Sequence, residues 1–301
     1  MPSFRARHHI PDLGVGVGFR PKHAADVLDR GGSPDVRWYE IISENFMSPW
    51  AAARGPAGGR PMANLARLRD AYPVIPHGVS LSIGAVAPLD EEYLARLRLL
   101  VDGLNPPYFT DHACFCRASG LDLHDLLPLP YTKEALAHVV ERVKRVQGAI
   151  ERPFALENVS SYLTYRESEM PEWEFLAELA ERADCGLLFD VNNVYVSAFN
   201  HGFDAETFID AIPADRVVQI HLAGHQDRGA YKLDNHGDHV RREVWSLYER
   251  TIRRVGSVST LIEWDENIPA FDVLAREAAI ASEHRDRALG AERTASREAV
   301  P

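Results

Sequence analysis

Residues 154–191 read FALENVSSYLTYRESEMPEWEFLAELAERADCGLLFDV. Residues 154–157 and 186–191 are short apolar runs of the kind that forms buried strands, and residues 172–183 repeat their apolar side chains at helical spacing. A strand, a helix and a second strand in this order form a unit whose two strands lie parallel. This stretch therefore predicts an α/β protein built on a parallel sheet.

The same alternation continues toward both ends of the chain. Apolar runs of strand length occupy eight places, at residues 13–17, 36–42, 74–83, 108–111, 154–157, 186–191, 217–222 and 259–264. Helical patterns fill most of the intervals, as at residues 132–147 and 243–255, and Thr132 is placed to cap the first of these two helices. Eight β/α units in about 280 residues match the usual size of a (β/α)8 TIM barrel.

The barrel pattern accounts for nearly the whole chain, and no linker interrupts it. We therefore expect a single catalytic domain over residues 1–284. The stretch 48–61, rich in Pro, Gly and Ala, is expected to be a long loop after the second strand, near the face where such barrels carry their active sites. Residues 285–301 lose the apolar periodicity and are expected to form a disordered C-terminal tail.

Composition restricts the function and the compartment. Of the 301 residues 46% are hydrophobic, and 33 Lys and Arg stand against 44 Asp and Glu, a net charge of −11. The hydrophobic share excludes a disordered chain, and the acidic balance disfavours nucleic-acid binding. Three cysteines are too few for a disulfide framework, and no segment approaches the ~18 consecutive apolar residues of a membrane span. We expect a cytoplasmic protein with no nucleic-acid or membrane partner.

Side chains able to bind metal lie in or directly after six of the expected strands. They are His77, His112, Glu157, Asp190, His221 and Glu263. The carboxyl ends of parallel barrel strands converge on one mouth, where three carboxylates would repel one another unless cations lay between them. One such residue alone is more often a core or capping residue. Six of them at strand ends predict a metal site.

A polar loop after the seventh strand adds two candidate ligands. Asp234 and His236 are two residues apart, which places both side chains on one side of an extended segment. The neighbouring His225, Asp238 and His239 are as readily explained by a solvated loop. Histidine and carboxylate ligands without a cysteine set fit Zn, Mn or Fe, and so many ligands favour two or three ions bridged by carboxylates. Hydrolysis, isomerisation and oxidation all remain open at this point.

Other residues keep two interpretations. The glycines at positions 14, 16 and 18 do not follow the dinucleotide-binding spacing and are interpreted as close packing at the first strand. The Cys114 and Cys116 pair is either redox-active or part of the core, and residues 40, 44 and 45 either line a substrate pocket or make loop hydrogen bonds. The residues whose roles stay open are Glu40, Glu44, Asn45, Cys114, Cys116, His201, His225 and His239.

Nine blocks of sequence, taken in order, resemble one known family. They are GVGVGFRP, WYEIISENF, PHGVSLSIG, TDHACF, LENVSSY, DVNNVYVSAFNHG, IHLAGH, DNHGDHV and IEWDEN. Over approximately residues 8–283 the chain is similar to the DUF692 family, the multinuclear non-haem iron-dependent oxidases. The resemblance implies a TIM-barrel enzyme that uses two or three iron ions and dioxygen to modify cysteine residues of a ribosomally made peptide, in some relatives a copper-binding one.

Carried over to this chain, the resemblance implies a role for each candidate ligand. One ion would be held by His77, His112 and Glu157. Glu157 would bridge it to a second ion, which Asp190, His221 and Glu263 would also hold. The catalytic residues would be the carboxylates Glu157, Asp190 and Glu263. A third ion would be held by Asp234 and His236, with Asn193 as a neutral ligand.

The resemblance also implies partners and an alternative. The substrate would be a cysteine-containing precursor peptide, and a small partner protein would recognise it. The chain is also similar to the xylose-isomerase-like superfamily, whose trinuclear zinc endonuclease branch has a histidine where this chain has Asn193. A divalent-metal-dependent hydrolase or sugar isomerase is therefore the alternative function.

Overall fold

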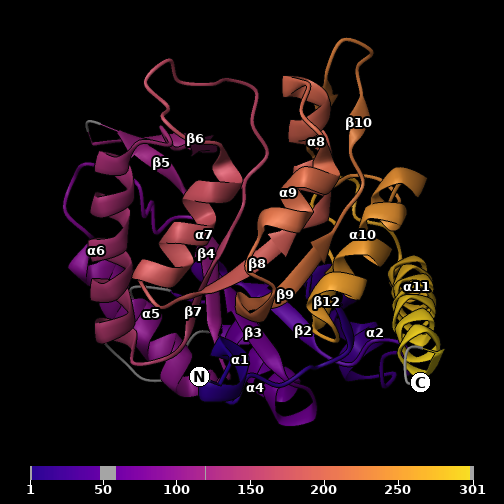
Figure 1. The fold of residues 1–301 in the computed structure, drawn as a ribbon. Coiled ribbons are helices and arrows are strands. Elements are labelled where there is room, and N and C mark those ends of the chain that lie inside the picture. Colours follow the sequence, from indigo (N-terminus) through magenta and orange to yellow (C-terminus); the bar gives the residue numbers. More distant parts are fainter. Residues whose placement is uncertain (1, 48–58, 119, 299–301) are drawn as a thin grey trace.

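The computed structural model of the chain describes residues 2–47, 59–118 and 120–298 (Figure 1). Eight strands, each parallel to its neighbours, close into a barrel in the order β1-β12-β9-β8-β7-β4-β3-β2. The strands are β1 Val15–Gly18, β2 Tyr39–Ile42, β3 Val74–His77, β4 Phe109–His112, β7 Phe154–Glu157, β8 Gly186–Asp190, β9 Val217–Leu222 and β12 Ser259–Ile262. The predicted TIM barrel is confirmed.

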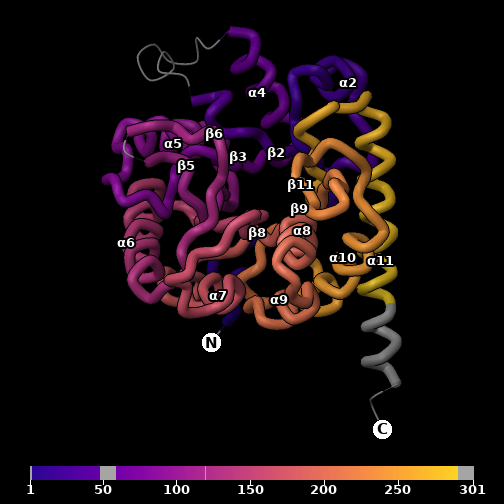
Figure 2. The backbone as a smooth tube through the Cα atoms, turned by 90° about the horizontal axis from the view of Figure 1, so that it is seen from above, coloured from indigo at the N-terminus to yellow at the C-terminus, as the bar shows by residue number. Residues whose placement is uncertain are grey.

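Helices surround the barrel on all sides, as the view from above shows (Figure 2). They are α1 Phe4–Arg7, α2 Ala24–Leu28, α4 Gly59–Ala71, α5 Glu91–Leu104, α6 Lys133–Ile150, α7 Glu172–Arg182, α8 Val191–His201, α9 Ala205–Ala211, α10 Arg242–Val255 and α11 Phe271–Glu298. Short 3-10 turns add η1 Pro21–His23, η2 Ser43–Asn45 and η3 Ala214–Arg216. No helix among the described residues is both long and apolar enough to cross a membrane.

The amphipathic pattern explains why these helices pack on the barrel. In α6 the Thr132 side chain accepts a hydrogen bond from the N–H of Ala135 at 3.0 Å, which is the predicted cap. The helix then buries Leu136, Val139, Val143, Val146 and Ile150 along one face. Burying such a side chain is worth about 1.5–3 kcal/mol, so this face holds the helix against the sheet.

A second apolar cluster fills the inside of the barrel. It consists of Phe4, Trp38, Ile75, Tyr108, Ala155, Val218 and Leu261. Gly16 makes room for it, because a Cβ at this position would lie 2.6 Å from the Trp38 ring. Since side chains two residues apart along a strand share a face, the inward positions of Ile75, Ala155 and Leu261 direct the residues two further on into the barrel as well. Those residues are His77, Glu157 and Glu263.

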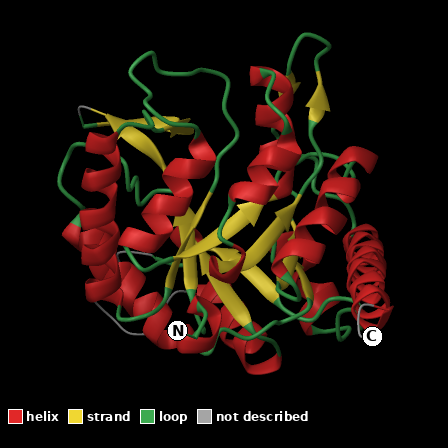
Figure 3. Ribbon diagram, viewed as in Figure 1, coloured by secondary structure: helices red, strands yellow, loops and turns green. Residues whose placement is uncertain are grey.

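Two short antiparallel hairpins add to the barrel and were not predicted. β5 Cys114–Ala118 pairs with β6 Leu121–Pro128, and β10 Gln226–Asp227 pairs with β11 Lys232–Leu233. Both stand on the side of the barrel where the strands end, together with the long connection that follows β7 (Figure 3). They build the rim of the mouth.

Helix α11 differs from the expected C-terminal tail. It begins at Phe271 and ends at Glu298, so residues 285–298 are helical where a disordered tail was expected. Arg287 bonds to Glu249 at 2.7 Å, and Ala288 is fully buried. The packed face of α11 is made largely of alanine, which is too small to show as an apolar stripe in the sequence. The expected loop at residues 48–61 falls mostly outside the described residues, and residues 59–61 begin α4.

Candidate metal centre

The six predicted strand-end residues meet inside the mouth of the barrel. All are buried, with at most 9% of each residue exposed. Their potential ligand atoms form two groups that share one residue, Glu157. The first group is His77, His112 and Glu157, and the second is Glu157, Asp190, His221 and Glu263. Strands far apart in the sequence thus place their last side chains within reach of a common centre.

The two carboxylate oxygens of Glu157 face different partners. Its Oε2 lies 3.4 Å from Nε2 of His77 and 3.3 Å from Nε2 of His112. Its Oε1 lies 3.6 Å from Nδ1 of His221, and that nitrogen lies 3.0 Å from Oε2 of Glu263. A carboxylate that turns one oxygen to each of two ligand groups is placed to bridge two ions.

Several oxygens of this centre lack a hydrogen bond. Glu157 Oε2, Asp190 Oδ2 and Asn193 Oδ1 are buried, and no described residue donates to any of them. Leaving a buried acceptor unpaired costs about 1–3 kcal/mol, and more for a charged one. Cations bound among these atoms would satisfy all three, and imidazole with carboxylate ligands suits Zn, Mn or Fe. The residues therefore fit the predicted metal ions.

Two of the histidines are oriented by neutral groups. His77 Nδ1 is hydrogen-bonded to Oγ1 of Thr110 at 2.8 Å, and His112 Nδ1 lies 3.0 Å from the carbonyl oxygen of Gly78. Each ring therefore turns Nε2 toward Glu157. Burial, together with the neighbouring His112 and His221, holds the pKa of His77 well below its usual range. A neutral imidazole is the form that binds metal.

His221 is oriented by a carboxylate beneath the centre. Its Nε2 lies 3.2 Å from Oε2 of Glu40, which turns Nδ1 toward Glu157 and Glu263. Gln219 donates to the same oxygen of Glu40 at 2.6 Å. Burial lowers the pKa of His221, but the carboxylates of Glu40, Glu263 and Glu157 outweigh it and raise the pKa well above its usual range. Glu40 thus supports a candidate ligand, and this contact gives a role to a residue whose role the sequence leaves open.

Asp190 and Asn193 are fixed by the start of α8. The Asp190 side chain caps this helix by accepting from the N–H of Asn193 at 2.5 Å. The Asn158 amide group and the Asp190 backbone exchange two hydrogen bonds of 2.9 Å. Burial raises the pKa of Asp190 well above its usual range. The sequences LEN and DVNN are therefore one interlocked unit, which presents the remaining oxygens of Asp190 and Asn193 to the centre.

The two loop candidates lie beside one another at the rim. His236 Nε2 is 2.7 Å from Oδ1 of Asp234, and Asn192 donates to the same oxygen at 2.7 Å. His225 in turn lies 2.8 Å from Oδ1 of Asn192 and supports it. The amide nitrogen of Asn193, the third predicted ligand of this position, donates to Glu157 at 3.5 Å and to the carbonyl oxygen of Asn158 at 3.0 Å, while its Oδ1 has no hydrogen-bond donor among the described residues. Ligation at this position stays a prediction.

One residue of this region has no counterpart among the predicted ligands. Asp265 Oδ2 lies 3.1 Å from Nδ1 of His236, and the same nitrogen lies 3.1 Å from Oε2 of Glu263. His236, Glu263 and Asp265 form a third group of potential ligand atoms. Asp265 stands two residues after Glu263 in IEWDEN, so the alternation along the eighth strand could have pointed to it.

The centre opens into a cavity of about 480 Å³. Its lining includes His77, His112, Glu157, Asn193, Asp234, His236, Glu263 and Asp265, together with Arg20 and Tyr162. Asp190 and His221 are not part of this lining and lie beneath it. A substrate in the cavity would therefore face the lining residues of the centre, whereas Asp190 and His221 would support the centre from below.

The remaining open residues are supporting or separate. Glu44 accepts hydrogen bonds from the N–H groups of Val79 and Ser80 at 2.9 and 2.7 Å, and thus fixes the connection after β3. His201 is 2.8 Å from Oγ of Ser161, and His239 pairs with Glu277 at 2.7 Å. The two cysteines of β5 are both free and buried, and burial raises the pKa of both thiols, which favours a packing role.

Comparison with known proteins agrees with this architecture. Residues 14–286 match the family described as RiPP precursor modification enzyme MbnB/TglH/ChrH, where RiPP denotes a ribosomally synthesised and post-translationally modified peptide. A UPF0276 protein of Anaeromyxobacter sp. (strain Fw109-5) is 54% identical over 279 residues, which cover 93% of this chain and 95% of that protein. A UPF0276 protein of Acaryochloris marina (strain MBIC 11017) is 43% identical over 265 residues, covering 88% of this chain and 92% of that one.

Solved structures show the same barrel at much lower identity. An L-ribulose 3-epimerase matches with a TM-score of 0.58 and 13% identity, covering 95% of this chain and 98% of that one. This likeness concerns the fold alone, since such barrels carry many chemistries. The family match and the two close relatives go further: this chain belongs to the MbnB/TglH/ChrH family of RiPP precursor modification enzymes, which is the DUF692 family.

Proposed function

We propose that this chain is an oxidase that uses two or three iron ions and dioxygen to modify cysteine residues of a ribosomally synthesised precursor peptide. The observation that carries the proposal is the position of Glu157, whose two oxygens face two separate groups of histidine and carboxylate ligands. The family to which the chain belongs supplies the substrate class, a RiPP precursor.

The candidate ligands divide among the ions as follows. His77, His112 and Glu157 would hold the first ion, and Asp190, His221 and Glu263 would hold the second, with Glu157 shared. Asp234 and His236, with Asn193, would hold the third. Iron bound there would supply redox chemistry with dioxygen as the oxidant: the cysteine residue would lose four electrons and four protons, which would reduce one dioxygen to two molecules of water.

The residues of the chain prepare the centre before any ion arrives. Thr110, the Gly78 carbonyl and Glu40 fix the rings of three histidines, so little reorientation is needed when a ligand bond forms. We assign Glu157, Asp190 and Glu263 as the catalytic carboxylates, because they would hold the first and second ions and their negative charges would offset those cations. The polar cavity above them has room for a short peptide segment that carries the cysteine.

A second protein is part of the proposal. The family to which the chain belongs modifies RiPP precursors. We propose that a small partner protein recognises the leader of the precursor and delivers the cysteine to the barrel. We place the reaction in the cytoplasm, where such peptides are made and where the three free buried cysteines stay reduced.

The test combines metal content, oxygen consumption and peptide mass. The chain is purified anaerobically, loaded with Fe²⁺ or with Zn²⁺, and mixed with a cysteine-bearing precursor peptide and a small recognition protein chosen from its neighbouring genes. We expect oxygen consumption only when both iron and a peptide with its cysteine are present. We expect a mass change at the cysteine only when iron and oxygen are both present. Activity of the zinc form without oxygen would contradict the proposal and favour the metal-dependent hydrolase or isomerase.

A further inference from the structure

We propose that Asp265 and Arg20 set the affinity of the third metal position from outside its ligand set. Asp265 would do so by fixing the ring of His236. Arg20 would do so by offsetting part of the negative charge of Asp265. The inference rests on the metal centre of the proposed function and adds two positioning residues to it.

The ring of His236 lies between two carboxylates. Its Nε2 is 2.7 Å from Oδ1 of Asp234, a candidate ligand that lines the cavity. Its Nδ1 is hydrogen-bonded to Oδ2 of Asp265 at 3.1 Å. A histidine that binds metal through one nitrogen normally donates the N–H of the other to a carboxylate or carbonyl. Asp265 therefore plays for His236 the part that Glu40 plays for His221, and it leaves Nε2 free for the ion.

Glu263 competes for the same nitrogen but has another task. Its Oε2 lies 3.1 Å from Nδ1 of His236 and 3.0 Å from Nδ1 of His221. Because Glu263 belongs to the group of the second ion, that ion would take up its oxygen. Asp265 would then be the remaining acceptor for the Nδ1–H of His236.

The backbone, and not Arg20, holds Asp265 in place. The N–H of Asp265 donates to the carbonyl oxygen of His236 at 2.8 Å, and Asn235 donates to Glu266 at 2.8 Å. His236 itself has a positive φ of 45°, a strained backbone conformation for a residue with a Cβ, and these hydrogen bonds stabilise it. Removing the Arg20 side chain would thus leave the carboxylate of Asp265 beside His236.

Arg20 contributes charge. Its guanidinium donates to Oδ1 of Asp265, and its side chain is only 11% exposed against 41% for Asp265. It is the one Lys or Arg among the described residues that line the cavity. Lys22 and His23 bond to the carbonyl oxygens of Ile268 and Pro269, so the segment stays docked without Arg20. A cation on Asp265 weakens the pull of this carboxylate on the Nδ1 proton and repels the nearby dication.

Two substitutions should therefore change the affinity in opposite directions. Metal-free full-length chain is titrated with Zn²⁺ by calorimetry, and the bound zinc is counted by elemental analysis. In the unchanged chain we expect two ions to bind before the third. Asp265→Asn should weaken the third ion about 10- to 100-fold without changing the first two. Arg20→Gln should tighten the third ion by up to about tenfold.

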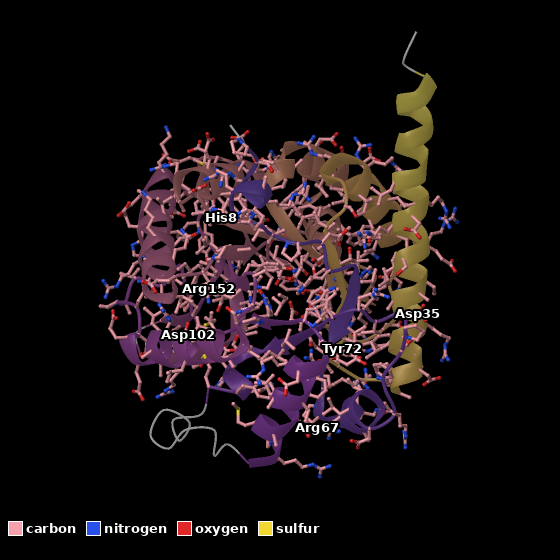
Figure 4. All side chains as sticks on the ribbon, turned by 90° about the horizontal axis from the view of Figure 1, so that it is seen from below. His8, Asp35, Arg67, Tyr72, Asp102 and Arg152 are labelled. Carbon is pink, nitrogen blue, oxygen red and sulfur yellow. The ribbon has the colours of Figure 1, made fainter. Side chains whose placement is uncertain are left out.

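Controls separate charge from general damage. Arg20→Lys keeps the charge and should leave the affinity for the third ion as it is in the unchanged chain. Arg20→Gln combined with Asp265→Asn should match Asp265→Asn alone, because Arg20 acts through Asp265. Arg67→Gln breaks an exposed ion pair with Asp29 and should have no effect, since Arg67 lies on α4 and is seen from below the barrel (Figure 4). Thermal unfolding of each metal-free variant shows whether it folds.

A spectroscopic readout is independent of affinity. In the zinc-loaded chain, long-range proton–nitrogen NMR correlations should show His236 protonated at Nδ1. A proton at Nε2, a chain that never binds a third ion, or an Asp265→Asn variant with unchanged third-ion affinity would each overturn the inference. So would weakening of the third ion by Arg20→Gln. Because this experiment contains no iron, oxygen or peptide, it can fail while the proposed oxidase activity stands, and the reverse also holds.

Discussion

At the scale of single residues, the centre depends on carboxylates that each keep one buried oxygen without a hydrogen bond from any described residue. Glu157 and Asp190 are 1% and 0% exposed, and each keeps an oxygen that no described residue satisfies. Such groups are a cost to the fold unless a cation offsets them. This is the feature that distinguishes the mouth of this barrel from an ordinary polar cavity.

Glu157→Gln and Asp190→Asn are each expected to abolish activity while the chain still folds. Each change removes one negative charge that offsets a cation, and each keeps the shape of the side chain. Metal content by elemental analysis should fall, with circular dichroism unchanged from that of the metal-free parent. A variant that retained near-normal metal content and turnover would show that the two residues do not share a site.

Glu40→Gln tests the support beneath the centre. The amide would keep the size of the side chain but lose the carboxylate that fixes His221, and changes of this kind cost about 10- to 100-fold in metal affinity. Competition with a chelator of known affinity should show the loss for the second ion. Glu206→Gln, at an exposed ion pair with Arg250, is the matched control and should leave the affinity unchanged.

At the scale of elements, helix α11 tests where the folded chain ends. Arg285 bonds to Asp12 and Ser257, Arg287 bonds to Glu249, and Ala288 is buried, so these residues tie α11 to α10 and to the segment before β1. Removing residues 285–301 is therefore expected to lower the melting temperature. Removing only residues 299–301 is the control. An unchanged melting temperature after the longer deletion would support the disordered tail expected from the sequence.

At the scale of the whole molecule, metal ions and folding should be coupled. Without cations, the carboxylates of Glu157, Asp190 and Glu263 face one another in a buried site, whereas bound ions stabilise the folded chain by mass action. Removal of metal with a chelator is expected to lower the melting temperature, and Zn²⁺ should restore it. A melting temperature that does not depend on added metal would contradict a shared metal centre.

The opposite face of the barrel has its own acid-sensitive contact. Asp184 pairs with Arg7 of α1 at 2.7 Å and with Arg216 at 3.0 Å, and these bonds lower the pKa of its carboxyl to about 2. Because the folded value lies below the unfolded one, ionised Asp184 stabilises the fold above about pH 4, and this contribution is lost as the pH falls through about 2.

Asp184→Asn is therefore expected to lower stability at pH 7 and to have little effect near pH 2. The loss should stay below about 1 kcal/mol, because the carboxylate is half exposed and screened by solvent. Urea unfolding at both pH values measures it. An equal loss at the two pH values would show that the carboxylate charge does not contribute.

Local pattern was enough to predict the barrel and six of its strand-end residues. The alternation of strand and helix lies in consecutive residues. Because parallel barrel strands end at one mouth, the sequence alone predicts that the six strand-end residues meet there, namely His77, His112, Glu157, Asp190, His221 and Glu263. The start of the helix at Thr132 is equally local, because the capping side chain and the N–H group that it accepts from are only three residues apart. The resemblance to the family rested on the same strand ends.

Contacts across the closed barrel could not be predicted in this way. Glu40 reaches His221 from 181 positions away, and Arg20 reaches Asp265 from 245. Which nitrogen each histidine turns to the centre depends on such partners, and on a strand register that exists only after the barrel has closed. Helix α11 likewise stays ordered through alanines and ion pairs whose partners lie on other elements. Periodicity shows the direction in which a side chain points, whereas packing of distant segments sets what it meets there.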